Sequence, residues 1–415
     1  MRAILALIVT FSLFFITCSK KEEKEITLKE KAQKLAQQLI IVDTHIDVPY
    51  RLREKWEDVS TRTKDGHFDY VRAKEGGLNA PFMSIYVPAK YQKTGGAKEL
   101  ADSLIDMVNK FPMDWPDKFA MAYSPADINS NFGTGKMSLL MGMENGAPIE
   151  GNLENVKYFY EQGIRYITLA HSKNNHICDS SYDTIPKWNG LSPFGEKVVA
   201  EMNHQGIMVD ISHVTDSTFY DVMKITKAPV IASHSSCRYF TPDWERNMSD
   251  DLIRILGKNG GVIQVTFGSA FLKNEYREKG REIRKELNKH IDEEGWGRRD
   301  EHAKAYLDEY YHTHHLGTVA DVADHIDHVV ELTGIDHVGI GSDFDGVAFL
   351  PEGLSDVSGY PNLIEELLKR EYSEEDIQKI CSGNIMRVMS EVEQVSQKLQ
   401  SFDEQNYSGE QYASQ

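Results

Sequence analysis

Cysteine is scarce in this sequence of 415 residues. Four cysteines occur, at Cys18, Cys178, Cys237 and Cys381, and no two of them form a Cys-x-x-Cys pair. A zinc site built from thiolates is therefore not indicated. If Cys18 is modified, three remain, and the sequence does not select a pair for a disulfide.

An excess of basic charge is also missing. The formal net charge is −18, and the isoelectric point is near 5.3. Such an acidic surface repels nucleic acid, so no nucleic-acid partner is expected. Apolar residues make up 40% of the chain, which is enough for a large buried core in one or two domains.

Long apolar runs are confined to the N-terminus. An arginine at position 2 precedes the apolar stretch 3–16. This stretch is too short, and wrongly flanked, for an ordinary membrane-spanning helix, and it is typical of a signal peptide. No later stretch is long and apolar enough to span a bilayer.

The end of this segment indicates how the protein is anchored. Phe15-Ile16-Thr17-Cys18 resembles the lipobox of bacterial lipoproteins, in which the cysteine is lipidated and becomes the first residue of the mature chain. We predict a lipoprotein signal peptide over 1–17 and a charged tether over 18–27. The protein is then exported and lipid-anchored to a bacterial membrane, facing the periplasm or the cell surface. A plain secretory signal cleaved nearby is the alternative.

Short apolar runs recur along the rest of the chain and predict eight strands. They are 39–42, 82–87, 138–143, 165–170, 207–212, 229–233, 261–267 and 338–342. Segments with helical periodicity lie between several of them, and this alternation predicts an α/β fold with a TIM-like (β/α)8 barrel. An open doubly wound sheet is the alternative. No Gly-x-Gly-x-x-Gly motif follows a strand, which counts against a dinucleotide-binding version.

Two segments do not follow the strand–helix rhythm. Residues 272–316 are rich in opposite charges at helical spacing, and we predict an inserted helical arm over the mouth of the barrel. Residues 396–415 are polar and predict a flexible C-terminal tail. The barrel domain is expected to span 28–395.

Ligating side chains stand where six of the eight predicted strands end. They are His45, Asp47, Glu144, His171, His213, His234 and Asp343. The carboxyl ends of parallel strands in a barrel meet at one face, so we expect these side chains to form one cluster. His45 and Asp47 are two residues apart, and in extended chain they point to the same side.

Imidazole and carboxylate groups without thiolate are ligands for zinc, and also for manganese, iron or cobalt. One catalytic zinc usually takes three protein ligands, so this larger set fits two metals about 4 Å apart with a bridging carboxylate. Such a pair lowers the pKa of bound water to about 7 and provides a hydroxide at neutral pH. Asp343 is then predicted to carry the proton to a leaving nitrogen.

Several motifs together resemble a known family. They are Asp43-Thr44-His45-Ile46-Asp47 and the segments 142–146, 165–172, 210–214, 229–236, 246–248 and 339–346. The chain resembles the membrane (renal-type) dipeptidases, peptidase family M19, a branch of the amidohydrolase superfamily. The resemblance extends from about residue 36 to residue 392.

The resemblance implies a metal-dependent hydrolase of dipeptides, including those with a C-terminal D-residue, that acts through a metal-bridging hydroxide. It implies two zinc ions per chain. His45 and Asp47 would hold the first zinc, His213 and His234 would hold the second, and Glu144 would bridge both. A dipeptide substrate is the implied small-molecule partner, and a homodimer is the implied oligomer.

The resemblance also implies roles for three residues outside the ligand set. Asp343 would be the general acid/base. His171 would polarise the scissile carbonyl or stabilise the oxyanion. Arg246 would bind the C-terminal carboxylate of the substrate, which suits a planar guanidinium with two parallel donors.

One position departs from the family pattern. After Val265-Thr266-Phe267 the resemblance implies a substrate-binding tyrosine, but this chain has Gly268, so that contact is lost or comes from the inserted arm. The alternative enzyme is another amidohydrolase, such as a deaminase, or a hydrolase of lactones or β-lactams. A catalytically dead lipoprotein that binds metal or peptide is the third reading, and it is disfavoured because Asp343 and all five ligands are present.

Overall fold

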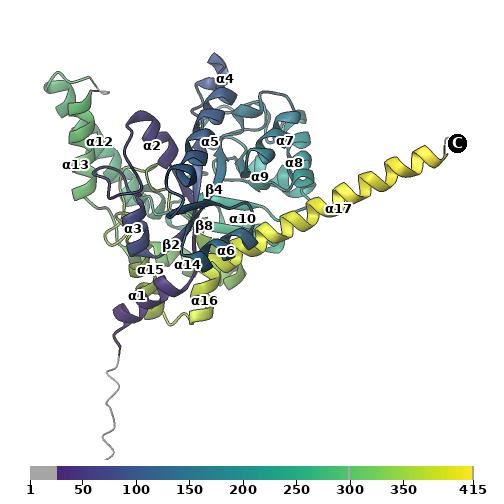
Figure 1. The fold of residues 1–415 in the computed structure, drawn as a ribbon. Helices are drawn as coiled ribbons and strands as arrows, with labels where there is room; N and C mark the ends of the chain where they lie inside the picture. Colours follow the sequence, from purple (N-terminus) through teal and green to yellow (C-terminus); the bar gives the residue numbers. More distant parts are fainter. Residues whose placement is uncertain (1–25, 298–299, 414–415) are drawn as a thin grey trace, which may run out of the picture.

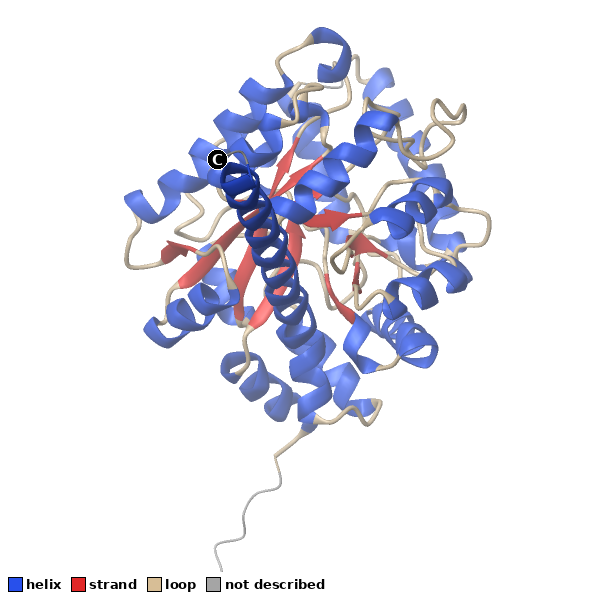
Figure 2. Ribbon diagram, turned by 90° about the vertical axis from the view of Figure 1, so that its right-hand side faces the viewer, coloured by secondary structure: helices blue, strands red, loops and turns tan. Residues whose placement is uncertain are grey.

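The strands of the computed structural model form a ring at the centre of the molecule, and helices surround it (Figures 1 and 2). The structure describes residues 26–297 and 300–413. The strands are β1 (Ile41–Ile46), β2 (Leu78–Tyr86), β3 (Phe119–Met121), β4 (Met137–Glu144), β5 (Ile164–Thr168), β6 (Met208–Asp210), β7 (Ile231–Ser235), β8 (Val262–Val265) and β9 (Val338–Ile340). They pair in parallel in the order β1-β2-β4-β5-β6-β7-β8-β9. This is the nearly closed, TIM-like barrel of eight parallel strands that the sequence predicts.

Helices alternate with these strands, and most of them cover the outside of the barrel. The helices are α1 (Leu28–Gln38), α2 (Val48–Glu54), α3 (Tyr70–Gly76), α4 (Tyr91–Thr94), α5 (Ala97–Asp114), α6 (Pro125–Thr134), α7 (Glu154–Glu161), α8 (Pro193–Gln205), α9 (Asp216–Ile225), α10 (Asp250–Lys258), α11 (Ser269–Leu272), α12 (Asn274–Glu293), α13 (Glu301–Thr313), α14 (Val319–Thr333), α15 (Tyr360–Lys369), α16 (Glu374–Gln378) and α17 (Asn384–Ala413). Each predicted strand overlaps a strand of the structure. The short β3, which pairs with β4 outside the ring, was not predicted.

Local sequence sets where several of these helices begin. Hydroxyl side chains cap α8, α9 and α10: Ser192 accepts a hydrogen bond from Gly195 N–H, and Thr215 and Ser249 do the same for their helices. Such caps satisfy amide groups that have no partner inside the helix. They fix the length of each loop between a strand end and the next helix, and therefore the position of the residues in that loop.

The seam of the barrel lies between β9 and β1 and is closed by backbone contacts just beyond β9. Asp343 N–H donates to the carbonyl of His45 at 3.0 Å, and Asp47 N–H donates to the carbonyl of Phe344 at 2.9 Å. The buried carboxylate of Asp43 accepts hydrogen bonds from the N–H groups of both His45 and Ser342. The seam therefore brings Asp343 next to His45 and Asp47.

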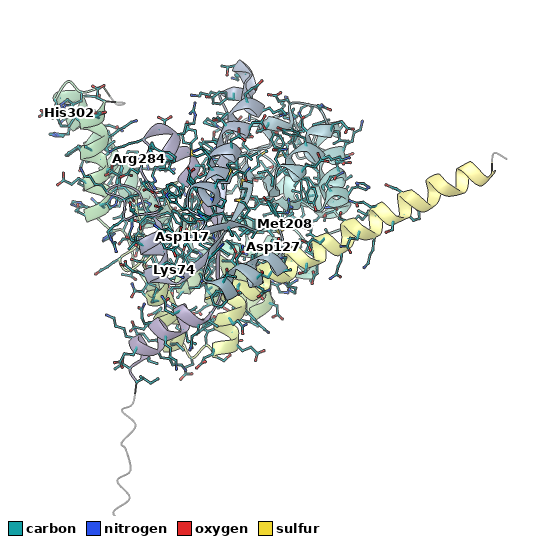
Figure 3. The ribbon with its side chains drawn as sticks, in the orientation of Figure 1. Lys74, Asp117, Asp127, Met208, Arg284 and His302 are labelled. Carbon is teal, nitrogen blue, oxygen red and sulfur yellow. The ribbon has the colours of Figure 1, made fainter. Side chains whose placement is uncertain are left out.

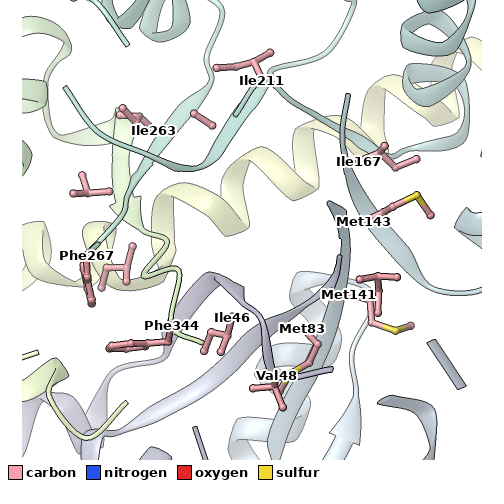
Figure 4. Packing of buried hydrophobic residues seen from close by; sticks show 14 of the residues in the cluster. Ile46, Val48, Met83, Met141, Met143, Ile167, Ile211, Ile263, Phe267 and Phe344 are labelled. Carbon is pink, nitrogen blue, oxygen red and sulfur yellow. The ribbon is translucent and has the colours of Figure 1, made fainter. Parts of the chain in front are cut away.

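The hydrophobic core has two main parts. Residues that fill the layer between the strands and the helices form the larger part, of which Figure 4 shows Met83, Met141, Ile167, Ile263 and others. A second cluster lies inside the amino-terminal half of the barrel. It contains Val42, Phe82, Leu140, Tyr166, Ile231 and Val262 of the strands and Ile385, Val388, Met389 and Val392 of α17. The start of α17 thus packs against the barrel at the end opposite the carboxyl ends of the strands.

The inserted arm is a helical hairpin, as predicted, made of α12 and α13. Ile283 and Leu287 of α12 pack with Tyr306 and Tyr310 of α13 and with Phe349, in a small core of their own. The hairpin projects from one edge of the barrel (Figure 1). Its first residues follow directly on α11, so its base lies near the carboxyl end of β8.

The C-terminal segment differs from the expectation of a flexible tail from residue 396. Helix α17 continues through it to Ala413 and projects from the barrel (Figure 1). Ser396 Oγ donates to the carbonyl of His204 at 2.6 Å, and Gln400 Nε2 donates to the same oxygen at 2.9 Å. These bonds join this part of the helix to the C-terminal end of α8.

The predicted signal peptide, Cys18 and nearly all of the charged tether lie outside the described residues. Within the part of the chain that is described, no helix is both long and apolar enough to cross a membrane.

Candidate active site

The seven predicted cluster residues meet at the carboxyl ends of the strands. Their ligating atoms fall into three overlapping groups, in each of which these atoms lie within 4.8 Å of one another. The groups are His45 with Glu144 and His234, Glu144 with His171 and His213, and His45 with Asp47 and Asp343. Sequence positions 300 residues apart are therefore brought to one place by the closure of the barrel.

Glu144, the last residue of β4, lies at the centre of the cluster. Its Oε1 is 3.1 Å from His213 Nε2, 3.4 Å from His234 Nε2 and 3.5 Å from His171 Nε2. Its Oε2 is 3.6 Å from His45 Nε2. Burial alone raises the pKa of this carboxyl, but the facing histidines, His171 and His45 foremost, hold its pKa well below the ordinary value. Glu144 therefore presents a charged oxygen to each half of the cluster.

Hydrogen bonds from behind orient two of the histidines. The hydroxyl of Tyr166 donates to the carbonyl of Thr44 at 3.0 Å and lies 2.8 Å from His45 Nδ1. Behind His234, Ser233 Oγ donates to Asp210 at 2.6 Å and lies 2.8 Å from His234 Nδ1. Since each hydroxyl proton is used elsewhere, this network assigns the Nδ1 proton to both imidazoles. Each ring then points its Nε2 into the cluster.

The donor atoms of the cluster fit a bound cation. Two buried atoms, His45 Nε2 and Asp47 Oδ1, have no hydrogen-bond partner. The Nε2 atoms of His213 and His234 are only 2.8 Å apart, although burial lowers the pKa of both imidazoles well below the ordinary value. Neutral nitrogens and carboxylate oxygens that converge in this way are stabilised by a divalent metal between them.

The backbone around the cluster is held in an uncommon conformation. His213 and Asp343 have φ angles of 68° and 65°, and Asn145 and Asp345, close to two cluster residues, have 82° and 67°. Residues other than glycine rarely adopt this left-handed region, and it persists where the surrounding structure fixes it. At Gly346 the constraint is steric. A Cβ atom at this position would collide with Oδ1 of Asp343 and Oδ2 of Asp47.

Asp343 is buried beside two other carboxylates. Burial is the largest cause of a pKa that lies well above the ordinary value, and Asp47 and Glu144 raise it further. His45 acts in the opposite direction. A carboxyl in this environment holds a proton more readily than a carboxyl in water, as a group that exchanges protons during a reaction requires.

Arg246 is buried, with 2% of its surface exposed, and lies at the edge of the cluster. Its Nη1 donates to Ser235 Oγ at 2.8 Å, and its Nη2 donates to the carbonyl of His234 at 2.8 Å. Nη2 also lies 3.1 Å from His213 Nε2. The guanidinium is 5.0 Å from the ring of Phe271. It therefore places a fixed positive charge beside the cluster, where an anion would be stabilised.

Several residues that shape the site were not predicted. Tyr166 and Asp210, which act from behind the histidines, lie on β5 and β6, and nothing in a single sequence separates such residues from the rest of a buried strand. Tyr182 was also missed. Its ring is 5.7 Å from that of His213 and 6.4 Å from that of Trp244. Only its place in the long loop after His171 could have indicated it.

A barrel of parallel strands with a histidine–carboxylate cluster at the carboxyl ends defines the class of the protein. It is a metal-dependent hydrolase of the amidohydrolase type.

Comparison with known proteins narrows this class. The family model described as "Membrane dipeptidase (Peptidase family M19)" matches residues 29–403. Dipeptidase verJ of Clonostachys rogersoniana is 33% identical over 393 residues, which are 90% of this chain and 90% of that protein. The chain belongs to the membrane dipeptidase family, peptidase family M19, and is a metal-dependent dipeptidase.

Solved structures share the whole fold. The probable dipeptidase PvdM from Pseudomonas aeruginosa superposes with a TM-score of 0.76 at 26% identity, covering 89% of this chain and 99% of that one. A metallopeptidase from Rhodobacter sphaeroides, solved with a phosphinate mimic of the dipeptide L-Ala-D-Ala, gives a TM-score of 0.69 at 25% identity and covers 85% of this chain and 99% of that one.

Proposed function

We propose that this protein hydrolyses dipeptides at a site with two zinc ions, and that Asp343 is its general acid/base. The observation that carries the proposal is the position of Glu144. Its two oxygens face different halves of the cluster, one half containing His45 and the other containing His213 and His234. A carboxylate between two sets of nitrogen and oxygen donors is suited to bridge two cations.

The residues around the two proposed zinc ions then have distinct roles. His45, Asp47, Glu144, His213 and His234 would hold the two cations, which would supply a hydroxide nucleophile at neutral pH and Lewis-acid polarisation of the scissile carbonyl. Asp343, with its raised pKa, takes the proton of the nucleophile and delivers it to the leaving nitrogen. The side chain of His171 is 19% exposed, more than the other histidines of the cluster, and donates to the carbonyl oxygen as negative charge develops there.

Arg246 limits the substrate to short peptides with a free C-terminus. A guanidinium fixed by two hydrogen bonds beside His213 binds the terminal carboxylate and sets its distance from the scissile bond. A longer peptide has no carboxylate at that distance. The dipeptide mimic carried by the Rhodobacter sphaeroides relative has a C-terminal D-residue, which supports the inclusion of L,D-dipeptides among the substrates proposed for this chain.

Release of free amino acids from a dipeptide panel tests this function. The full-length protein, in detergent, is assayed on L,L- and L,D-dipeptides before chelation, after chelation and after zinc is restored. We expect the protein to hydrolyse both L,L- and L,D-dipeptides. Chelation should remove the metal and abolish the activity, and the activity should return when about two zinc ions per chain are bound. Binding of two metals without hydrolysis of any dipeptide would contradict the proposal and favour another amidohydrolase substrate.

We further propose that the protein is exported and lipid-anchored through Cys18, on the basis of the signal peptide and lipobox in the sequence. Cys18→Ser is expected to move the protein from the membrane fraction to the soluble fraction of the producing bacterium. Ser19→Ala, which keeps the cysteine, is the matched control and should stay with the membrane. Retention of Cys18→Ser in the membrane fraction would contradict the anchor.

The homodimer stays a prediction, which sedimentation of the purified protein checks.

A further inference from the structure

The base of the inserted arm contributes side chains to the mouth of the site. Phe271 of α11 stacks on the guanidinium of Arg246, and its ring is 5.0 Å from that of Trp244. The guanidinium of Arg277, in the first turn of α12, lies 4.7 Å over the ring of Trp244. A continuous row of contacts, Arg246–Phe271–Trp244–Arg277, therefore leads from the cluster to the arm.

The glycine after β8 is part of this arrangement. A Cβ atom at Gly268 would lie 2.7 Å from Val347 Cγ1 and 2.9 Å from Phe271 Cδ2. Since Phe271 fills this space, a tyrosine cannot occupy the position, and the substrate contact expected there must come from elsewhere. The arm is the segment that supplies the neighbouring side chains.

Arg277 forms no ion pair with an acidic side chain within residues 26–297 and 300–413. Its one hydrogen bond among the described residues is from Nη1 to Asn274 Oδ1 at 3.1 Å, and its buried Nε has no partner. Three other partly buried arginines are ion-paired, Arg51 with Asp345, Arg238 with Asp216 and Arg370 with Asp327, and Arg165 instead donates to three backbone carbonyls. Arg277 is half-buried and held by an aromatic ring, and its guanidinium has N–H donors without an acceptor or a carboxylate partner. Such a group is suited to bind an anion.

Tyr182 connects Arg277 to the reaction site. Its ring is 6.4 Å from that of Trp244, over which Arg277 lies, and 5.7 Å from that of His213. A second row of ring contacts therefore joins the cluster to Arg277. Because Phe271 stacks on Arg246, a C-terminal residue held by Arg246 would have the base of the arm beside it.

We propose that Arg277 binds an anionic side chain on the C-terminal residue of the substrate, so that the enzyme prefers dipeptides ending in glutamate or aspartate. The inference rests on the proposed dipeptidase function and adds a substrate class to it. Arg277 is a specificity residue here and takes no part in the chemical step.

Isosteric substrate pairs test this preference. Ala-Glu and Ala-Gln have nearly the same shape and differ in one charge, and Glu-Ala and Gln-Ala provide the same comparison at the other residue. We expect kcat/KM of the full-length zinc enzyme to favour Ala-Glu over Ala-Gln about tenfold, as one charge-assisted pair supplies. No comparable difference is expected between Glu-Ala and Gln-Ala.

Arg277→Gln is expected to abolish the preference for Ala-Glu, mainly through KM, and to leave hydrolysis of Ala-Gln within about twofold of wild type, because the variant keeps the reacting groups. Arg284→Gln removes the same charge from an exposed position of α12, seen on the arm in Figure 3, and should leave the preference intact.

An unchanged Ala-Glu to Ala-Gln ratio in Arg277→Gln would overturn the inference. A preference that appears only for Glu-Ala would overturn it too, because Arg277 would then serve the N-terminal residue. If the wild-type enzyme cleaves no dipeptide of the panel, Ala-Gln included, the dipeptidase function itself is contradicted. This result differs from an unchanged preference in Arg277→Gln, so failure of the function and failure of the inference are distinguishable.

Discussion

Asp343→Asn is expected to lower kcat by about 10³-fold while the enzyme keeps its metal, because an amide has nearly the same shape but cannot accept and return a proton. The residue is buried with a pKa well above the ordinary value, and its N–H is fixed to the carbonyl of His45, so the substituted side chain should stay in place. The measurement is kcat on a simple dipeptide together with the zinc content of the purified variant.

A carboxylate at the other end of the barrel provides the control. Asp336 is exposed and pairs with Lys379 at 2.9 Å, far from the cluster, so Asp336→Asn should keep full activity. Near-normal kcat in Asp343→Asn would reject the acid/base role. Loss of zinc together with activity would instead make Asp343 a metal ligand, since its carboxylate lies in one group with His45 and Asp47.

Arg246→Met is expected to lower kcat/KM for dipeptides with a free C-terminus by about 10²-fold, and to change little for the same dipeptides with an amidated C-terminus. Methionine keeps an apolar stem against Phe271 but removes the donors that we propose bind the terminal carboxylate. The measurement is the ratio of kcat/KM for Ala-Ala and Ala-Ala-amide, in the wild type and in the variant.

Arg238 is a matched control for this substitution because it belongs to the same loop and forms a partly buried ion pair with Asp216. Arg238→Met tests whether loss of an arginine from this loop disturbs the site by itself, and it should leave the ratio unchanged. Equal losses on free and amidated substrates in Arg246→Met would show that Arg246 acts on the structure of the cluster and not on the carboxylate.

Strand and helix periodicity predicted most of the barrel. The predicted runs 138–143, 165–170 and 261–267 overlap β4, β5 and β8, and they can be recognised because nearly all residues of these strands are buried and most are therefore apolar or small. The short β3 carries no comparable signal: it has three residues, two of them only partly buried, and it pairs on one side. The C-terminal segment is polar, and its sequence does not reveal that it continues α17 or that Ser396 and Gln400 bond to α8.

The sequence by itself determined the chemistry of the site. The cluster residues are of the types that bind metal, and each follows a buried strand, so a parallel barrel must gather them at one face. Only the tertiary structure decided how they act. The orientation of His234 by Ser233, the burial that raises the pKa of Asp343, and the unpaired Arg277 at the mouth all depend on contacts between residues distant in the chain. A ligand type is a local property of the sequence, whereas its orientation, its pKa and its free donors are set by the neighbours that folding provides.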